Sequence, residues 1–254
     1  MFESIFLGIV QGLTEFIPVS STAHLVLLPE FFGWSGLVNS LTFDIALHFG
    51  TTAALLGYFW KDWLDILLNR RKLLLLIVLG TVPVGIVGIL FKDLISDHLR
   101  RMDVIAAMLV LFGGVMLLSE RTKTRKTLAD FNIRDVLIVG FAQTLALIPG
   151  VSRSGITIAA GLFAGYQRQD AARFSFLLST PAVLGATILE SPAILKGLDA
   201  DISVFLSGFL CSLVAGLAAL GFLMKFLKRN PVTVFVYYRF LLAGGIILTL
   251  CLRG

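Results

Sequence analysis

Two polar breaks interrupt an otherwise apolar chain of 254 residues, and their residue types could do phosphate chemistry. The first break lies within 8–24 and carries an amide, a carboxylate, a proline, a hydroxyl cluster and an imidazole: Gln11, Glu15, Pro18, Ser20, Ser21, Thr22 and His24. The second lies within 140–154 and carries Pro149, Gly150, Ser152, Arg153 and Ser154. Ionisable groups are costly in apolar surroundings, so each break is a functional hypothesis. If the breaks meet, they assemble a site for a metal ion and a phosphate.

The first break offers ligands for a cation. Gln11 and Glu15 are four residues apart, which places them on one helical face. A carboxylate beside an amide oxygen suits a hard divalent cation that keeps several waters, Mg²⁺ or Ca²⁺. The alternative is that Glu15 pairs with a basic residue to satisfy itself in the membrane.

The hydroxyl cluster after Pro18 offers nucleophiles. A serine near a histidine can form an activated nucleophile, and either Ser21 or His24 can accept a phosphoryl group covalently. The alternative is that these hydroxyls only satisfy backbone groups freed by Pro18.

Arg153 is the strongest single residue in the second break. A guanidinium is always charged and matches phosphate oxygens bidentately. Gly150 allows close backbone approach, Ser152 and Ser154 add donors, and the helix that begins near Gly155 favours anions at its N-terminus. The alternative is an ion pair between Arg153 and Glu15, which is compatible with a resting state of the same site.

Other polar residues are less informative. Asp44 and His48 share one helical face and either support the site or pack as hydrogen-bonded groups. Arg239 lies one turn inside the last apolar segment, so we expect it to extend to the membrane interface. Cys211 and Cys251 lack the spacing of a metal or redox pair and are predicted to be small packing residues.

Composition predicts an all-α, polytopic membrane protein. The mean hydropathy is +0.92, 57% of residues are hydrophobic and 15% are charged, which a soluble domain of this size cannot accommodate. Sustained strand alternation is missing, whereas apolar runs of helical length recur. The net charge of +5 does not indicate nucleic acid, because the basic residues lie in short loops between apolar segments.

The apolar segments predict a single integral membrane domain over 1–254, built as an inverted-topology repeat. Six segments read as full transmembrane helices: 41–60, 73–91, 103–119, 172–190, 202–224 and 235–252. The stretches 2–33 and 135–165 are broken at Pro18 and at Pro149-Gly150, leaving arms too short to span. Such arms predict two re-entrant helix-loop-helix hairpins. Each half, about 1–119 and 134–252, is then one hairpin and three spans, joined by a basic loop at 120–133.

Charge distribution orients this layout. Loops 61–72, 120–134, 166–173 and 225–234 hold most of the Lys and Arg residues, which puts them in the cytoplasm. The first hairpin then enters from the exterior face and the second from the cytoplasmic face, with their tips near the midplane.

The two breaks resemble the signature motifs of the bacterial undecaprenyl-diphosphate phosphatase family, also called bacitracin-resistance proteins. The strings that carry the resemblance run from Gln11 to His24 and from Pro149 to Thr157. The resemblance implies hydrolysis of undecaprenyl diphosphate to undecaprenyl phosphate and inorganic phosphate with a divalent cation. It also implies the bacterial cytoplasmic membrane, recycling of the lipid carrier for peptidoglycan synthesis, and an active site open to the exterior.

The family motifs assign roles residue by residue. The resemblance gives Glu15 and Gln11 metal and acid/base roles, Ser21 or His24 the nucleophilic role, and Arg153 the phosphate clamp. Phosphate or backbone contacts fall to Ser20, Thr22, Gly150, Ser152, Ser154 and Thr157. Gln11 stands where many members have Glu, which removes one carboxylate from the predicted metal site.

A transporter or lipid flippase is the competing class, because inverted repeats with broken helices are also a transporter architecture. Lipid phosphatases of the acid-phosphatase type are disfavoured, since no histidine follows Arg153. The sequence leaves open the identity of the cation, the preferred prenyl length, translocation of the lipid and formation of a homodimer.

Overall fold

The fold is a helical bundle, seen in a computed structural model that describes residues 1–91, 94, 98–197 and 202–253. Those residues form no β-strand, only an isolated bridge between Lys126 and Tyr166. Within them, five helices are long and apolar enough to cross a membrane. They are α5 (Arg71–Leu90), α7 (Met102–Ser119), α10 (Arg168–Gly197), α11 (Ile202–Phe226) and α12 (Thr233–Arg253). The predicted class of polytopic, all-helical membrane protein is therefore confirmed.

The sixth predicted span differs from the other five. Residues 41–60 give α3 (Leu41–Tyr58), which is not among the helices that meet the length and hydropathy of a span. Asp44, His48, Thr51 and Thr52 make its sequence more polar than an uninterrupted apolar run. The range 61–72, expected as a loop, contains the short helix α4 (Trp60–Asn69).

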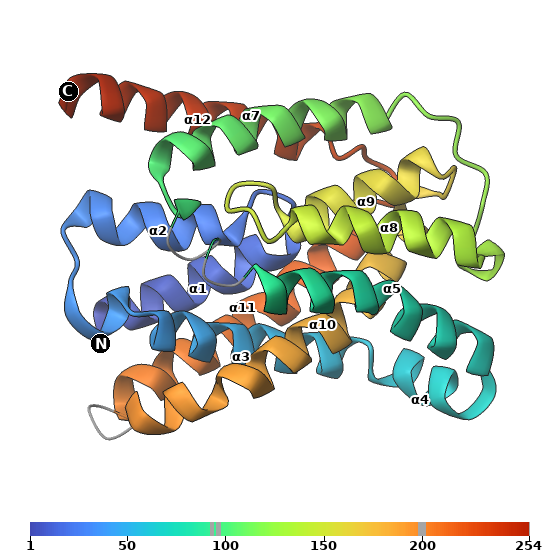
Figure 1. Cartoon of the computed structure of the whole chain (residues 1–254), viewed down its shortest axis with the longest axis horizontal. Coiled ribbons are helices and arrows are strands. Elements are labelled where there is room, and N and C mark those ends of the chain that lie inside the picture. Colours follow the sequence, from blue (N-terminus) through green and yellow to red (C-terminus); the bar gives the residue numbers. More distant parts are fainter. Residues whose placement is uncertain (92–93, 95–97, 198–201, 254) are drawn as a thin grey trace.

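Two helix pairs end at the predicted breaks. The first pair is α1 (Phe2–Phe16) and α2 (Ser21–Phe32), of 15 and 12 residues. The second is α8 (Ile133–Leu145) and α9 (Arg153–Phe163), of 13 and 11 residues. All four are shorter than the ~20 residues of a spanning helix. Figure 1 shows the two hairpins entering from opposite ends of the bundle, with their tips meeting in the middle.

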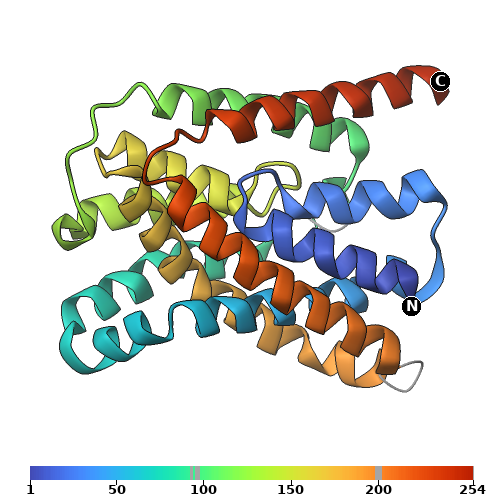
Figure 2. The same ribbon diagram turned by 180° about the vertical axis from the view of Figure 1, so that it is seen from behind.

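Each hairpin packs on a long helix from the other half of the chain. The first arm α1 lies along α11, and α8 lies along α5. Helices α7 and α12 run side by side at one edge of the bundle (Figure 2). Close approach depends on glycine: a Cβ on Gly8 would lie 2.6 Å from the carbonyl oxygen of Gly208. This close backbone contact fixes the position of α1 along the axis of α11.

Ion pairs tie together the end of the bundle where the basic loops gather. The Arg168 Nε–H is shared between both oxygens of the Glu120 carboxylate, at 3.0 and 2.8 Å, and Glu120 Oε1 also accepts the Val232 N–H at 2.7 Å. Lys126 Nζ lies 2.8 Å from Asp135 Oδ2 at the start of α8. These contacts anchor the second hairpin where it leaves the connecting loop.

Candidate active site

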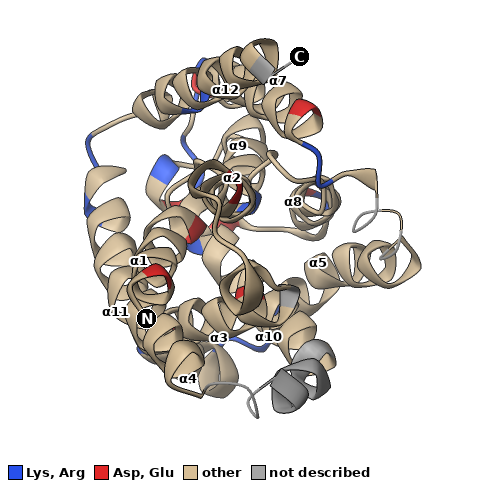
Figure 3. Ribbon diagram, turned by 90° about the vertical axis from the view of Figure 1, so that its left-hand side faces the viewer, with Lys and Arg blue, Asp and Glu red and all other residues tan. Residues whose placement is uncertain are grey.

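The two hairpin tips bring the predicted carboxylate and guanidinium into contact. Arg153 Nη2 donates to Glu15 Oε1, although the residues are 138 positions apart. Both side chains are largely buried, with 8% of Glu15 and 14% of Arg153 exposed. Figure 3, seen along the bundle, shows acidic and basic segments in its interior near α2 and α9. The ion pair of Arg153 with Glu15, given above as the alternative compatible with a resting state of the site, is therefore present.

The second carboxylate oxygen of Glu15, Oε2, contacts other polar side chains near the first tip. Ser21 Oγ donates to Glu15 Oε2 at 2.6 Å, and Gln11 Nε2 donates to the same oxygen at 3.0 Å. His48 Nε2, from α3, lies 3.7 Å from it. In the sequence, His48 has no definite role, because it only shares a helical face with Asp44. The fold places His48 beside the catalytic candidates.

Two buried polar atoms at this centre have no hydrogen-bond partner among the described residues. They are Gln11 Oε1 and Arg153 Nη1. Buried polar atoms without partners are rare and mark places where a ligand or water completes the structure. Arg153 can therefore hold Glu15 with one nitrogen and offer the other to a phosphate oxygen, while Gln11 Oε1 offers a hard oxygen ligand.

The donor set is compatible with a divalent cation bound together with substrate. In the described part of the chain, no cluster of three or more His, Cys, Asp or Glu side chains could hold a metal by itself. Mg²⁺ commonly uses one or two carboxylates, waters and substrate phosphate oxygens. Glu15 and the unpartnered Gln11 Oε1 supply the protein share of such a site.

Both tips have an unusual backbone that the sequence did not reveal. Ser20 and Ser152, which precede α2 and α9, have φ angles of 75° and 71°. Gly150 has φ +95°, and a Cβ there would lie 2.7 Å from the carbonyl oxygen of Ile105 in α7. Left-handed φ at non-glycine residues stores strain and clusters at functional sites. No residue-type signal marks Ser20 and Ser152 in this respect.

His24 is turned away from the Glu15 centre. Its Nδ1 donates to the Ser20 carbonyl at 2.8 Å, since a carbonyl only accepts. In the neutral ring, Nε2 then accepts from the Tyr238 hydroxyl at 2.7 Å. Of the two candidate nucleophiles, Ser21 is the one in contact with Glu15.

The other predicted contacts surround the second tip. Ser152 Oγ accepts the Gly155 N–H at 3.3 Å and lies 3.3 Å from Ser154 Oγ. Thr157 Oγ1 donates to the Arg153 carbonyl at 2.7 Å, so it fixes the backbone. Thr22 lies half-buried in the first turn of α2.

Two predictions about other residues are wrong. Arg239 does not extend to an interface but is fully buried, with 0% exposed, because backbone carbonyls surround its guanidinium. Cys251 is exposed and does not pack in the core, because it lies near the end of α12.

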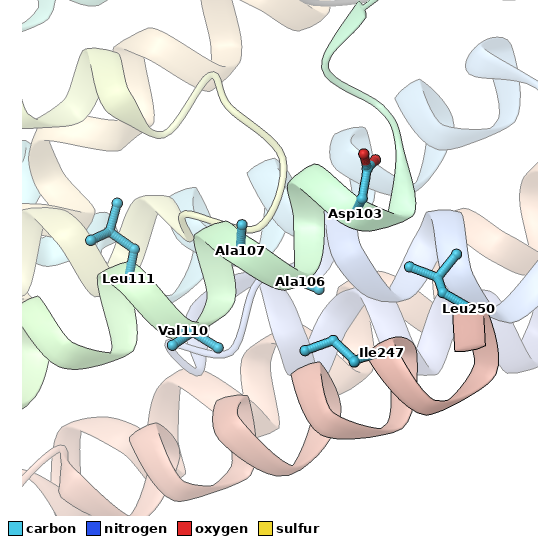
Figure 4. Close-up of a pocket in the computed structure, with 7 residues that line it drawn as sticks. All are labelled: Asp103, Ala106, Ala107, Val110, Leu111, Ile247 and Leu250. Carbon is cyan, nitrogen blue, oxygen red and sulfur yellow. The ribbon is translucent and has the colours of Figure 1, made fainter. Parts of the chain in front are cut away.

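An apolar groove lies apart from the tips, between α7 and α12. It has a volume of about 470 Å³ and is lined by Asp103, Ala106, Ala107, Val110, Leu111, Ile247 and Leu250. Figure 4 shows that these side chains come from the two adjacent helices. None of the residues at the hairpin tips lines this groove.

The apolar helices define an integral membrane protein, and the hairpin tips place a carboxylate, a hydroxyl and a guanidinium together inside it. Residues 4–245 match the family of the bacitracin resistance protein BacA, and the chain belongs to that family. It is 50% identical to an undecaprenyl-diphosphatase of Thermodesulfovibrio yellowstonii, over 100% of this chain and 99% of that protein. Proteins of the same name from Caldicellulosiruptor bescii and Desulforudis audaxviator are 40% and 43% identical, each over 100% of this chain and 98% and 99% of the relative.

Proposed function

We propose that this protein hydrolyses undecaprenyl diphosphate to undecaprenyl phosphate and inorganic phosphate. The activity is the one named for its full-length relatives, and it recycles the lipid carrier of cell-wall synthesis and confers resistance to bacitracin. The observation that carries the proposal is the convergence of Arg153 and Ser21 on Glu15 inside the bundle. Phosphoryl transfer needs charge neutralisation, an in-line nucleophile and a proton acceptor, and these three side chains supply them.

In the proposed reaction, Ser21 is the nucleophile and Glu15 its base. Ser21 Oγ already donates its hydrogen bond to Glu15 Oε2, so the proton has an acceptor. Oγ forms a bond to the terminal phosphorus while the bridging bond to undecaprenyl phosphate breaks. Water then cleaves the phosphoserine, releases inorganic phosphate and restores the hydroxyl. Arg153 Nη1 binds a phosphate oxygen through both steps.

Glu15 and Gln11 Oε1 would hold the divalent cation that this family's chemistry implies. Bound there with substrate, Mg²⁺ or Ca²⁺ would neutralise charge on the phosphate oxygens. Gln11 also donates to Glu15 Oε2, which orients the carboxylate for the serine.

The proposed layout is an inverted repeat with two re-entrant hairpins and six crossings, α3 included. Counterparts recur at an offset of 132 positions, from Ser21 at the start of α2 to Arg153 at the start of α9. The packing of the two halves is reciprocal. Helix α1 of the first half lies on α11 of the second, and α8 of the second half lies on α5 of the first. Glycines serve both contacts, since Gly8 abuts Gly208 and Gly140 abuts Gly80. These correspondences support two homologous halves.

We further propose that the site opens to the exterior of the bacterial cytoplasmic membrane. Basic loops gather at the end of the bundle opposite the first hairpin, which orients that hairpin toward the outside. The groove between α7 and α12 is almost entirely apolar and would suit a prenyl chain while the diphosphate reaches the tips.

The experiment is phosphate release by purified protein in detergent. Undecaprenyl diphosphate should yield one inorganic phosphate per molecule, and undecaprenyl monophosphate should yield none. Arg153→Ala is the inactive control. A preparation that moves the lipid between leaflets of a vesicle without releasing phosphate would support the transporter class in place of the hydrolase.

A further inference from the structure

We propose that two adjacent residues of α12, Tyr238 and Arg239, form a positioning unit that holds the two hairpin tips in register. The proposal rests on the hydrolase function above, since that reaction provides its readout. Neither residue contacts Glu15, Ser21 or the side chain of Arg153 in the described part of the chain. Both contact the backbone or side chains that place those groups.

Arg239 holds the second tip against α7. Its Nη2 donates to the Gly150 carbonyl at 2.8 Å and its Nη1 to the Val151 carbonyl at 3.0 Å. Its Nε and Nη2 reach two carbonyls of α7, Leu109 and Met108, each at 3.3 Å. One planar guanidinium therefore joins the tip to a long helix through four carbonyls. An ammonium has three donors and no planar fork, so lysine cannot reproduce this geometry.

Two of the carbonyls that Arg239 binds, those of Gly150 and Val151, belong to the strained part of the tip. Gly150 has φ +95° and Ser152 has φ 71°. A trans peptide is planar, with C=O and N–H pointing in opposite directions. Holding the Val151 carbonyl toward Arg239 therefore turns the Ser152 N–H away from it. The Val151–Ser152 peptide lies one residue before Arg153, where α9 begins. Its orientation therefore influences where the Arg153 side chain projects.

Tyr238 serves the first tip through His24. The Tyr238 hydroxyl is 2.7 Å from His24 Nε2, and the two rings stack with centroids 5.7 Å apart. On its other side, His24 donates to the carbonyl of Ser20, the residue with φ 75°. Ser20 precedes Ser21, so this chain of contacts fixes the peptide next to the proposed nucleophile.

The two tips are thus held by neighbouring residues of one helix. Each tip has a left-handed serine, and each has carbonyls bound by a side chain that belongs to α12 or is held by it. A small displacement of reacting groups, on the order of 1 Å, can reduce a rate about 100-fold. A rigid link between tips that enter from opposite ends guards against such displacement.

The test measures turnover of folded protein, with inorganic phosphate as a competitive inhibitor. We expect Arg239→Lys to lower kcat about 100-fold and to raise the inhibition constant of phosphate. Tyr238→Phe removes one hydroxyl and should lower kcat about 10-fold with little change in KM. Arg229→Lys and Tyr237→Phe are the matched controls, because both residues are exposed and neither side chain has a hydrogen-bond or ion-pair partner among the described residues.

A stability control separates positioning from general loosening of the fold. Leu220→Ala removes a fully buried side chain of α11 and should lower thermal stability while the folded fraction keeps its kcat. Arg239→Lys with normal kcat and normal phosphate inhibition would overturn the proposal. If that variant does not fold, Tyr238→Phe decides, because its half-exposed side chain is tolerant of change and a normal kcat would also overturn it. Absence of phosphate release by the wild type and the controls would instead reject the hydrolase function.

Discussion

The two hairpin tips share a backbone but divide the chemistry between them. Ser20 and Ser152 have nearly the same left-handed φ, and each precedes a helix that begins at the next residue. At the following position the first tip has Ser21 and the second has Arg153. The proposed nucleophile of the first tip therefore occupies the same position as the guanidinium of the second tip. The two tips share a backbone conformation but differ in chemical role.

The helices before the tips differ in the same way. Gln11 donates to Glu15, but its counterpart Gln143 has no hydrogen-bond partner for either polar atom of its side chain among the described residues. The position that corresponds to Glu15 is Leu147. Leucine cannot accept a hydrogen bond. The Gln143 amide therefore lacks the carboxylate partner that Gln11 has in Glu15. The comparison indicates that one tip carries the base and nucleophile, and that the other carries the clamp.

The largest effect should come from the carboxylate that only the first tip has. Glu15→Gln removes the base, the partner of Arg153 and a cation ligand together. A positioned general base contributes about 100- to 10,000-fold in rate, and this variant loses further charge contacts at the same time, so we expect turnover to fall more than about 1,000-fold. Phosphate release from the purified variant measures this. EDTA should also silence the wild type, and full activity in EDTA would exclude the cation.

Arg153 is the corresponding test of the second tip. Arg153→Lys and Arg153→Ala should each lower kcat about 100- to 1,000-fold, because an ammonium cannot bind Glu15 and phosphate with separate nitrogens of one plane. Steady-state kinetics on the diphosphate lipid would check this. Near-normal turnover of the lysine variant would rule out the clamp.

His48 tests whether the contact from α3 matters to the first tip alone. Its Nε2 lies 3.7 Å from Glu15, whereas Thr180, a polar residue of α10 in the other half, donates its hydroxyl within its own helix to the Phe176 carbonyl. We expect His48→Gln to lower kcat about 10-fold, as loss of one polar contact to a charge would. Thr180→Val is the matched control, and an equal loss in both variants would contradict the division between the tips.

The serines that precede the two helices should differ in stability. Ser152 Oγ caps α9 by accepting the Gly155 N–H, whereas the Ser20 side chain makes no cap hydrogen bond. Ser152→Ala should therefore reduce the free energy of unfolding by about 0.5–2 kcal/mol. Ser20→Ala should reduce it less. Thermal melts of the two variants in one detergent compare them, and a larger loss for Ser20→Ala would reverse the assignment.

The smallest effect is expected at Gln11. Gln11→Glu gives the first tip the second carboxylate that many family members have, at a position already suited to a cation. We expect turnover within about threefold of the wild type, and tighter binding of Mg²⁺ as measured by the concentration for half-maximal activity. A large loss would mean that the hydrogen bond from Gln11 Nε2 to Glu15 outweighs any gain in metal binding.

The membrane class, the two broken helix pairs and the groups that meet at the tips could all be predicted from the amino-acid sequence. Hydropathy is a local property, and a proline or a charge within an apolar run is visible without the fold. For that reason the ends of α1, α2, α8 and α9 lie close to the predicted breaks. The contact of Arg153 with Glu15 was also foreseeable, because a buried guanidinium needs an anion.

The atoms that are in contact at the tips, and the residues that support them, became known from the folded chain alone. His48 comes from α3 and Arg239 from α12, and no local pattern connects either residue to the tips. Arg239 could not be read as buried, because its partners are backbone carbonyls that every residue has. The left-handed Ser20 and Ser152 were hidden for a similar reason, since serine seldom adopts that φ unless the surrounding packing imposes it.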